Sequence, residues 1–281
     1  MEMPGLQGSK TVLCNQGIMV SIQGEQHMKE GKNRIQIIDA LRGFAVMLMV
    51  IHHLLYNFVY FLDAPKWLFT NPVFDILHYF FAGLFIFLSG VSSRFSRSNI
   101  RRGLIAIAFA LAISAVTFYM EMPIWFGVLH LLGFSMLFFG LISKLRYIIN
   151  DTDGRNESAL RNYFAPVIFI ILIAASSLAT ANFKLRVESS FLRILISVLG
   201  WPQQGFVSYD YFPILPWIFV FLLGTWAGLY IVARKLPNRF YEAELPFFPA
   251  VGRKALLIYI LHQPVLYAVV MGISALFGAQ R

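Results

Sequence analysis

The sequence predicts an all-α protein, a polytopic membrane bundle of about seven transmembrane helices. Hydrophobic residues make up 58% of the 281-residue chain. Charged residues make up only 13%, about half the share found in an ordinary soluble domain. Seven apolar stretches are each long enough to cross a bilayer as a helix. Basic residues gather in alternate loops between these stretches, which is the pattern of membrane topology signals.

The chain divides into a polar tail and one membrane domain. Residues 1–33 are rich in Gly and Gln and are expected to form a flexible cytoplasmic tail without a cleavable signal peptide. Residues 34–281 form the membrane domain. The segment from Phe191 to Gly200 is apolar but too short to span, so it is expected to be re-entrant or interfacial. The predicted spans are 37–61, 74–92, 103–120, 124–145, 163–182, 212–233 and 255–278.

The basic residues predict which side of the membrane each loop occupies. With the tail in the cytoplasm, sixteen Lys and Arg residues fall in cytoplasmic segments and five on the opposite side. The N-terminus is therefore predicted inside and the C-terminus outside, although an eighth span through 189–205 would reverse the C-terminus. The net charge of +9 belongs to these loops, so no nucleic-acid partner is expected. The five outer residues are Lys66, Lys184, Arg186, Arg193 and Arg281.

Cysteine usage and the lack of a recognisable soluble domain narrow the kinds of site to consider. The single Cys14 excludes an internal disulfide framework and a cysteine-based metal site, and no metal is expected. Membrane lipids are the expected surroundings, and the sequence leaves a homo-oligomer open. Any catalytic or binding site is expected in the membrane or in short loops.

The first span carries an unusual set of polar side chains. Asp39 and Arg42 lie near one end, and His52, His53 and Asn57 lie in the second half. Polar groups at membrane depth are costly and usually face a protein interior or a watery cavity, so this helix is a functional-site candidate. Arg42 and His53 are separated by roughly 16 Å of helix. Arg42 either pairs with Asp39, reaches lipid head groups or binds a ligand. His52 points about 100° away from His53, so at most one of them is expected to face a given site.

Polar residues from the other spans are expected to gather on two sides of the membrane. Arg101 and Arg102 lie on the cytoplasmic side, as topology signals or as a phosphate site. His262 lies about two turns in from the same side, in the run LHQP. Both His262 and His130 have an alternative role as interhelical hydrogen-bond partners. The residues of these spans that are expected to converge with His53 and Asn57 on an outward-facing pocket are Asp75, His78, Glu121, His130 and Asp210.

Five blocks of the chain resemble the heparan-α-glucosaminide N-acetyltransferase-like membrane proteins, a group rich in bacterial members. RIQIIDALRGFAVMLMVIHHLLYN resembles the opening of that family, and FFAGLFIFLSGVSSRFSRSNIRRG its second span and loop. WFGVLHLLGFSMLFFGLI, FPILPWIFVFLLGTWAGL and LLIYILHQPVLY resemble the fourth, sixth and last spans. The likeness covers about residues 34–270. The spacing of Arg42 and His53 also resembles the signature of the larger transmembrane acyltransferase group that O-acylates sugars.

The resemblance implies transfer of an acetyl group from cytosolic acetyl-CoA to an amine or hydroxyl of a sugar or glycan across the membrane. It also implies a multi-pass protein of the bacterial inner membrane. One departure concerns the catalytic histidine that is proposed for the lysosomal member, in the loop after the first span. Tyr60 to Leu77 contains no histidine here. The role then passes to His53 or His78, transfer is direct, or this member lacks the activity.

The mechanism we infer from the residues and the resemblance together places the donor on the cytoplasmic side. Arg101, Arg102 and Arg42 would bind the CoA phosphates, since the guanidinium fork suits phosphate oxygens. His53 would act as general base or transient acyl carrier, oriented by Asn57 or a nearby acid, with His78 as the second candidate. A transporter or exporter of a small polar or lipid-linked substrate is the alternative function, and a non-catalytic scaffold the third.

Overall fold

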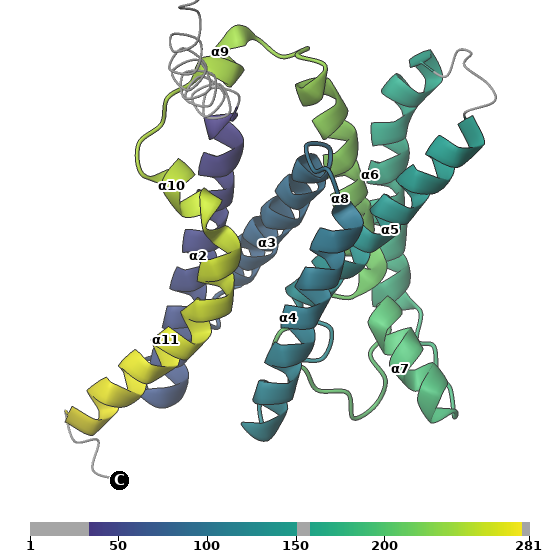
Figure 1. Ribbon diagram of the computed structural model, residues 1–281. Helices are drawn as coiled ribbons and strands as arrows, with labels where there is room; N and C mark the ends of the chain where they lie inside the picture. The colour runs from purple at the N-terminus through teal and green to yellow at the C-terminus, as the bar shows by residue number, and fades with distance from the viewer. Residues whose placement is uncertain (1–33, 151–157, 277–281) are drawn as a thin grey trace, which may run out of the picture.

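The computed structural model describes residues 34–150 and 158–276, and within them every regular element is a helix. The predicted tail, 1–33, lies outside the described residues. Seven helices are long and apolar enough to cross a membrane, as predicted. The spanning elements are α2 (Gln36–Phe61), α3 (Pro72–Ser93), α4 (Asn99–Tyr119), α5 (Val128–Asn150), α6 (Ser158–Asn182), α8 (Ile214–Val232) and α11 (Ala255–Leu276), and the short ones are η1 (Lys66–Leu68), α7 (Ser190–Leu199), α9 (Asn238–Glu242) and α10 (Phe248–Arg253) (Figure 1).

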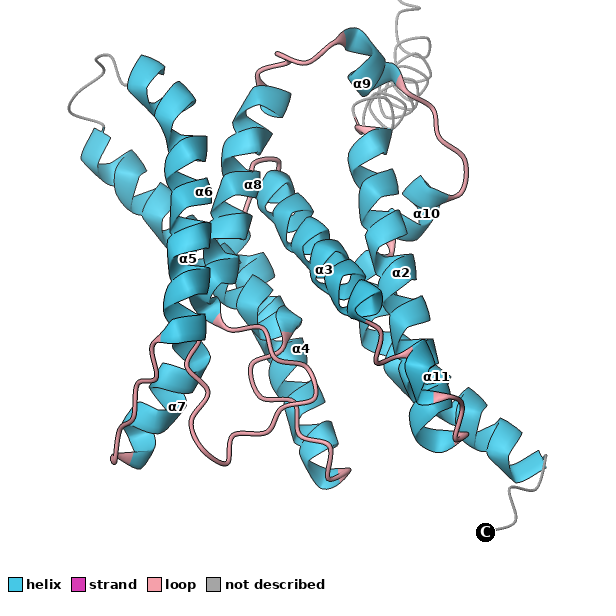
Figure 2. Cartoon of the chain, turned by 180° about the vertical axis from the view of Figure 1, so that it is seen from behind, coloured by secondary structure: helices cyan, strands magenta, loops and turns pink. Residues whose placement is uncertain are grey.

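Successive spanning helices run in opposite directions, so the bundle has two faces. We call the face at which α2 begins the first face and the opposite one the second face. The first face is the predicted cytoplasmic side and carries α9 and α10, whereas the second face carries α7 and the long loop before α8 (Figures 1 and 2). α3 lies between α2 and α8, and it contacts both of them (Figure 2).

Glycines let the central helices approach until their backbones touch. A Cβ atom on Gly90 of α3 would collide with the Phe221 carbonyl of α8, and one on Gly224 of α8 would collide with the Phe87 carbonyl of α3. In lipid, the hydrophobic effect does not drive helices together, so close packing of small residues is a main source of helix association. The contact between α3 and α8 is therefore the centre of the bundle.

A second glycine contact joins α10 to the start of α2. A Cβ on Gly43 would collide with the Phe248 carbonyl, and one on Gly252 would collide with the Asp39 carbonyl. The short helix α10 thus packs directly against the turn of α2 that carries Asp39 and Arg42. This contact fixes the first-face end of α2 relative to α11, because α11 begins only two residues after α10 ends.

Local capping explains where two of the helices begin. The Asn71 side chain accepts a hydrogen bond from the Val73 N–H at 3.0 Å, and Pro72 occupies the first position of α3. Ser98 caps α4 in the same way, accepting from the Arg101 N–H at 3.3 Å. α4 consequently begins at Asn99, four residues before the predicted start of that span.

The fourth span begins later than the sequence predicts. We expected helix from 124, but α5 starts at Val128 because the residues before it pair with the loop that precedes α8. The Tyr209 N–H donates to the Pro123 carbonyl at 3.2 Å, and the Phe212 N–H donates to the Phe126 carbonyl at 3.0 Å. The carbonyl groups that accept in this pairing therefore make these hydrogen bonds in place of helical ones.

The short apolar segment near 191–200 forms α7, a helix of ten residues. At 1.5 Å per residue it is about 15 Å long, half the thickness of a bilayer core. It therefore adds no eighth span, and the odd number of spans stands among the described residues.

We predict that Gly224→Val destabilises the bundle by about 3 kcal/mol or more, because its side chain would overlap backbone atoms that cannot rotate away. Thermal unfolding in detergent measures this loss of stability, with size-exclusion chromatography as the readout of the folded fraction. Gly272→Val in α11 is the matched control, since a Cβ there meets nothing within 4 Å. Equal melting temperatures for the two variants would contradict the central role of the contact.

Candidate active site

Four histidines from three helices meet in the middle of the bundle. His52 and His53 come from α2, His78 from α3 and His262 from α11. The ring centroids of His52 and His78 are 4.2 Å apart, those of His53 and His262 are 5.0 Å apart, and those of His52 and His53 are 5.5 Å apart. Within the described part of the chain, these and the other potential ligands do not form a group that could hold a metal ion.

A cavity of about 100 Å³ lies against this cluster. Its walls come mainly from α2 and α3, and His52, His53 and His78 all contribute to them. The expectation that only one of His52 and His53 faces a given site is therefore wrong. α2 has α3 on one side and α11 on another, so side chains 100° apart on it both point into the bundle.

A chain of amide groups connects His53 to Asn57. The Gln263 Nε2 atom lies 3.3 Å from His53 Nδ1, and the Asn57 Nδ2 atom lies 3.5 Å from Gln263 Oε1. Asn57 is buried, with 3% of its surface exposed. Asn57 can thus orient the His53 ring only through Gln263, a residue to which the sequence analysis gave no role.

The side-chain amides of Gln263 and Asn57 can both exchange their oxygen and nitrogen positions and keep the two hydrogen bonds. With Gln263 Nε2 toward the ring, His53 accepts at Nδ1 and carries its proton at Nε2. With Gln263 Oε1 toward the ring, His53 donates from Nδ1 and Nε2 holds a free lone pair. Gln263 therefore determines which nitrogen of His53 can act as a base.

His262 has its tautomer fixed by its own helix. Its Nδ1 atom lies 2.6 Å from the Tyr259 carbonyl oxygen, which can only accept, so Nδ1 carries the proton. The remaining nitrogen, Nε2, is buried and has no hydrogen-bond partner among the described residues. A bare, buried lone pair beside the His53 ring is costly in a folded protein, and such groups are concentrated at functional sites.

Asp210 reaches the second-face end of the same cavity from the loop before α8. Its Oδ2 atom accepts hydrogen bonds from the Val128 N–H and the Tyr259 hydroxyl, each at 3.2 Å. Burial raises the pKa of the Asp210 carboxyl, whereas these two hydrogen bonds oppose the rise. Gly127 lies so close that a Cβ there would collide with the carboxylate. Asp210 thus caps α5 and ties it to α11 beside the cavity.

The other residues predicted for the outer pocket lie elsewhere. Asp75 and Glu121 are exposed, and neither lines the cavity. His130 accepts from the Gly127 N–H at Nδ1 at 3.2 Å, and its Nε2 lies 3.3 Å from the Ser114 hydroxyl of α4. It therefore serves as the interhelical partner that the sequence analysis considered as its alternative role. Of the five outer-pocket candidates, the structure brings His78 and Asp210 together at the cavity.

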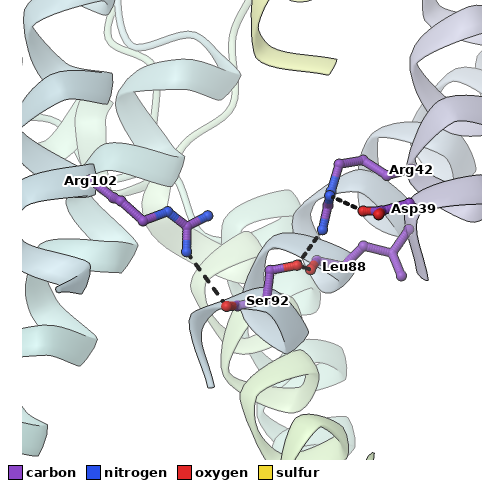
Figure 3. A network of polar contacts seen from close by, with 5 residues as sticks. All are labelled: Asp39, Arg42, Leu88, Ser92 and Arg102. Atoms are coloured by element: carbon purple, nitrogen blue, oxygen red, sulfur yellow. Dashed lines mark hydrogen bonds and ion pairs between the residues drawn. The ribbon is translucent and has the colours of Figure 1, made fainter. Parts of the chain in front are cut away.

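At the first face, two arginines meet at one serine (Figure 3). Arg42 pairs with Asp39, with 3.0 Å between Nη1 and Oδ1, and it also donates to the Ser92 hydroxyl. Arg102 reaches the Ser92 carbonyl from α4 at 3.5 Å. The three helices α2, α3 and α4 thus bring two guanidinium groups together. The Arg101 side chain is exposed and makes no hydrogen bond within the described residues.

Comparison with known protein families gives one match. The model of the heparan-alpha-glucosaminide N-acetyltransferase catalytic domain matches residues 34–264. The chain belongs to this family. The match confirms the resemblance seen in the sequence, and it includes both the arginine pair and the histidine cluster. It identifies the chain as a member of a family of membrane acetyltransferases. Comparisons with curated proteins and with solved structures give no match.

We predict that Asp210→Ala lowers the free energy of unfolding by about 1–2 kcal/mol, since α5 loses its cap and the Tyr259 hydroxyl loses its acceptor. Asp210→Asn keeps an oxygen acceptor and should retain most of the stability. Thermal unfolding in detergent measures both. The exposed Asp75→Ala variant is the control for loss of a carboxylate, and a loss as large as that of Asp210→Ala would contradict the capping role.

Proposed function

We propose that the protein transfers an acetyl group from acetyl-CoA, bound at the first face, to an amine or hydroxyl of a sugar or glycan that enters from the second face. The observation that carries this proposal is the arrangement on α2, where an arginine site and a histidine cavity lie on one continuous helix. The family match supports the reaction class. The distribution of basic residues supports the first face as the cytoplasmic side. The membrane in this proposal is a bacterial inner membrane.

The donor site is proposed at the arginines of the first face. Arg42 and Arg102 present their guanidinium groups on either side of Ser92, and Arg101 adds a third charge in the first turn of α4. Guanidinium forks bind phosphate oxygens with two parallel hydrogen bonds, so the CoA phosphates suit this site. The acetyl-bearing arm would then extend along α2 toward His53.

His53 is proposed as the general base. When Gln263 turns Oε1 toward the ring, His53 keeps a proton on Nδ1 and its Nε2 can take one from the acceptor amine or hydroxyl. The acceptor atom then forms a bond to the acetyl carbonyl carbon, and the carbon–sulfur bond breaks. The proton held by His53 passes to the CoA sulfur, which restores the neutral ring. In the covalent alternative, Nε2 first attacks the acetyl carbonyl carbon, and the carbon–sulfur bond breaks to release the CoA thiolate. The acceptor then takes the acetyl group from Nε2, and its proton passes to the thiolate.

The other polar groups of the cavity have supporting roles in this proposal. The bare Nε2 of His262 lies beside His53 and would stabilise its positive charge after proton transfer. His78 and Asp210 line the part of the cavity through which the acceptor would enter from the second face. They offer hydrogen-bond partners to a sugar in a cavity whose lining, apart from its histidines, Asp210 and Tyr259, is apolar.

We predict that His53→Ala lowers acetyl transfer by about 10²–10⁴-fold, the range expected for loss of a general base. Transfer from radiolabelled acetyl-CoA to a panel of amino sugars and neutral sugars, in proteoliposomes, measures the effect. Asn182→Ala is the control, because that side chain bonds only to the Leu178 carbonyl of its own helix. A folded His53→Ala protein with full transfer activity would disprove the assignment.

We also predict that Arg101→Ala/Arg102→Ala weakens acetyl-CoA binding by about tenfold or more, since each charged hydrogen bond contributes about 1.5–3 kcal/mol. Isothermal calorimetry of the detergent-purified protein measures the dissociation constant. Arg97→Ala/Arg239→Ala is the control, because it removes two exposed basic residues from the same face. No binding by the intact, folded protein would contradict the acetyltransferase proposal and favour a transporter.

A further inference from the structure

A second, larger cavity opens at the second face, away from the histidines. Its volume is about 580 Å³, and it lies between the end of α6, the segment that follows it, α7 and the turn after α7. We call it the α6–α7 pocket. It shares no residue with the histidine cavity. It is lined by Thr180, Ala181, Phe183, Lys184, Leu185, Arg186, Val187, Arg193, Trp201, Pro202, Gln203 and Gln204.

The charge of this pocket is unusual for its side of the molecule. The second face carries few basic residues, yet Lys184, Arg186 and Arg193 all line the same pocket. None of the three forms an ion pair with a carboxylate in the described part of the chain, and this includes the neighbouring Glu188. Three like charges around one cavity repel one another, so an anion bound between them would stabilise the arrangement.

Hydrogen bonds hold the walls of the pocket in place. The Gln203 Nε2 atom donates to the Leu185 carbonyl at 2.8 Å and to the Trp201 carbonyl at 3.0 Å, so it links the two sides. Arg193 donates from Nε to the Val187 carbonyl at 2.9 Å. This contact orients the guanidinium group and leaves its two Nη atoms without a partner among the described residues. The guanidinium group of Arg193 is thus held in one orientation, and its two Nη atoms bind no protein group in the described residues.

The outer surface beside the pocket is apolar and suits lipid chains. In α7, the side chains of Phe191 and Ile194 are 73% and 66% exposed. A helix of ten residues with exposed apolar side chains and a basic residue is typical of a segment that lies in the membrane interface. The side chain of Trp201 lines the pocket at the same level, where interfacial tryptophans are common.

We propose that the α6–α7 pocket binds the phosphate group of an anionic lipid head group, with the acyl chains against α7. Lys184, Arg186 and the free Nη atoms of Arg193 would hold the phosphate oxygens, and Gln204 and Trp201 would contact the rest of the head group. A soluble phosphate ester offers the same chemistry and is the other source of the ligand. The proposal does not depend on the acetyltransferase reaction, because the pocket is separate from the histidine cavity.

Native mass spectrometry of the full chain in detergent tests the proposal, with phosphatidylglycerol and phosphatidylcholine as probes. The wild type should retain phosphatidylglycerol in preference to phosphatidylcholine. Lys184→Ala/Arg186→Ala/Arg193→Ala should weaken phosphatidylglycerol binding by about a hundredfold, since each basic residue near a lipid surface contributes roughly a factor of five. The control is Arg97→Ala/Lys144→Ala/Arg239→Ala, which removes three exposed basic residues from the first face and should change binding less than threefold.

A second variant and a competition experiment complete the test. Lys184→Gln/Arg186→Gln leaves the Arg193 bond to Val187 intact, so it should fold and still lose about tenfold or more in phosphatidylglycerol binding. Competition with glycerol phosphate separates the sources, since displacement of the lipid assigns the pocket to soluble phosphate esters, and retention of the lipid assigns it to head groups. No preference for phosphatidylglycerol in the wild type, or equal losses in the triple variant and its control, would overturn the proposal.

Discussion

The backbone contact between α3 and α8 is the constraint on which the rest of the bundle depends. Inside a bilayer, apolar side chains gain little by leaving lipid for protein, so helices associate where their surfaces fit closely. Gly90 and Gly224 remove the side chains that would keep α3 and α8 apart. The contact fixes the rotation of α3 about its own axis. Consequently His78 faces α2 in the middle of the bundle, and Ser92 faces Arg42 and Arg102 at the first face.

The same contact organises the first-face end of α3. Arg94 follows the last turn of this helix and donates from Nε to the Thr225 carbonyl of α8 at 2.9 Å. Its guanidinium carbon also lies 4.8 Å from the centre of the Phe139 ring of α5. One arginine thus joins three helices at the first face, and the loop that leads to Arg101 and Arg102 in the first turn of α4 begins from a fixed position.

The polar groups within the membrane differ in whether the protein gives them hydrogen-bond partners. His130 and Asp210 have partners on neighbouring helices, and their contacts hold α4, α5 and α11 together. His262 keeps a buried nitrogen without a partner in the described residues, and this nitrogen lies beside His53. An unpaired polar atom in the interior lowers the stability of the fold, so its presence points to a chemical role and not to a stabilising one. This difference separates the structural histidine from those of the candidate site.

The sequence by itself determined the all-helical class, the seven spans and the family, because hydropathy and span length are local properties and the family motifs are contiguous. It also offered the pairing of Arg42 with Asp39 as one of three roles for Arg42, since residues three apart on a helix are neighbours, and the structure contains this pair.

Only the tertiary structure decided which intramembrane polar residues meet. Gln263 lies 210 positions from His53 in the chain, and no local pattern relates the two. Asp75 and Glu121 were expected at the pocket by depth alone, yet they are exposed. Depth in the membrane follows from position along the sequence, whereas the direction in which a side chain points depends on the rotation of its helix. That rotation is set by close contacts such as Gly90 with the Phe221 carbonyl and Gly224 with the Phe87 carbonyl, between residues far apart in the chain.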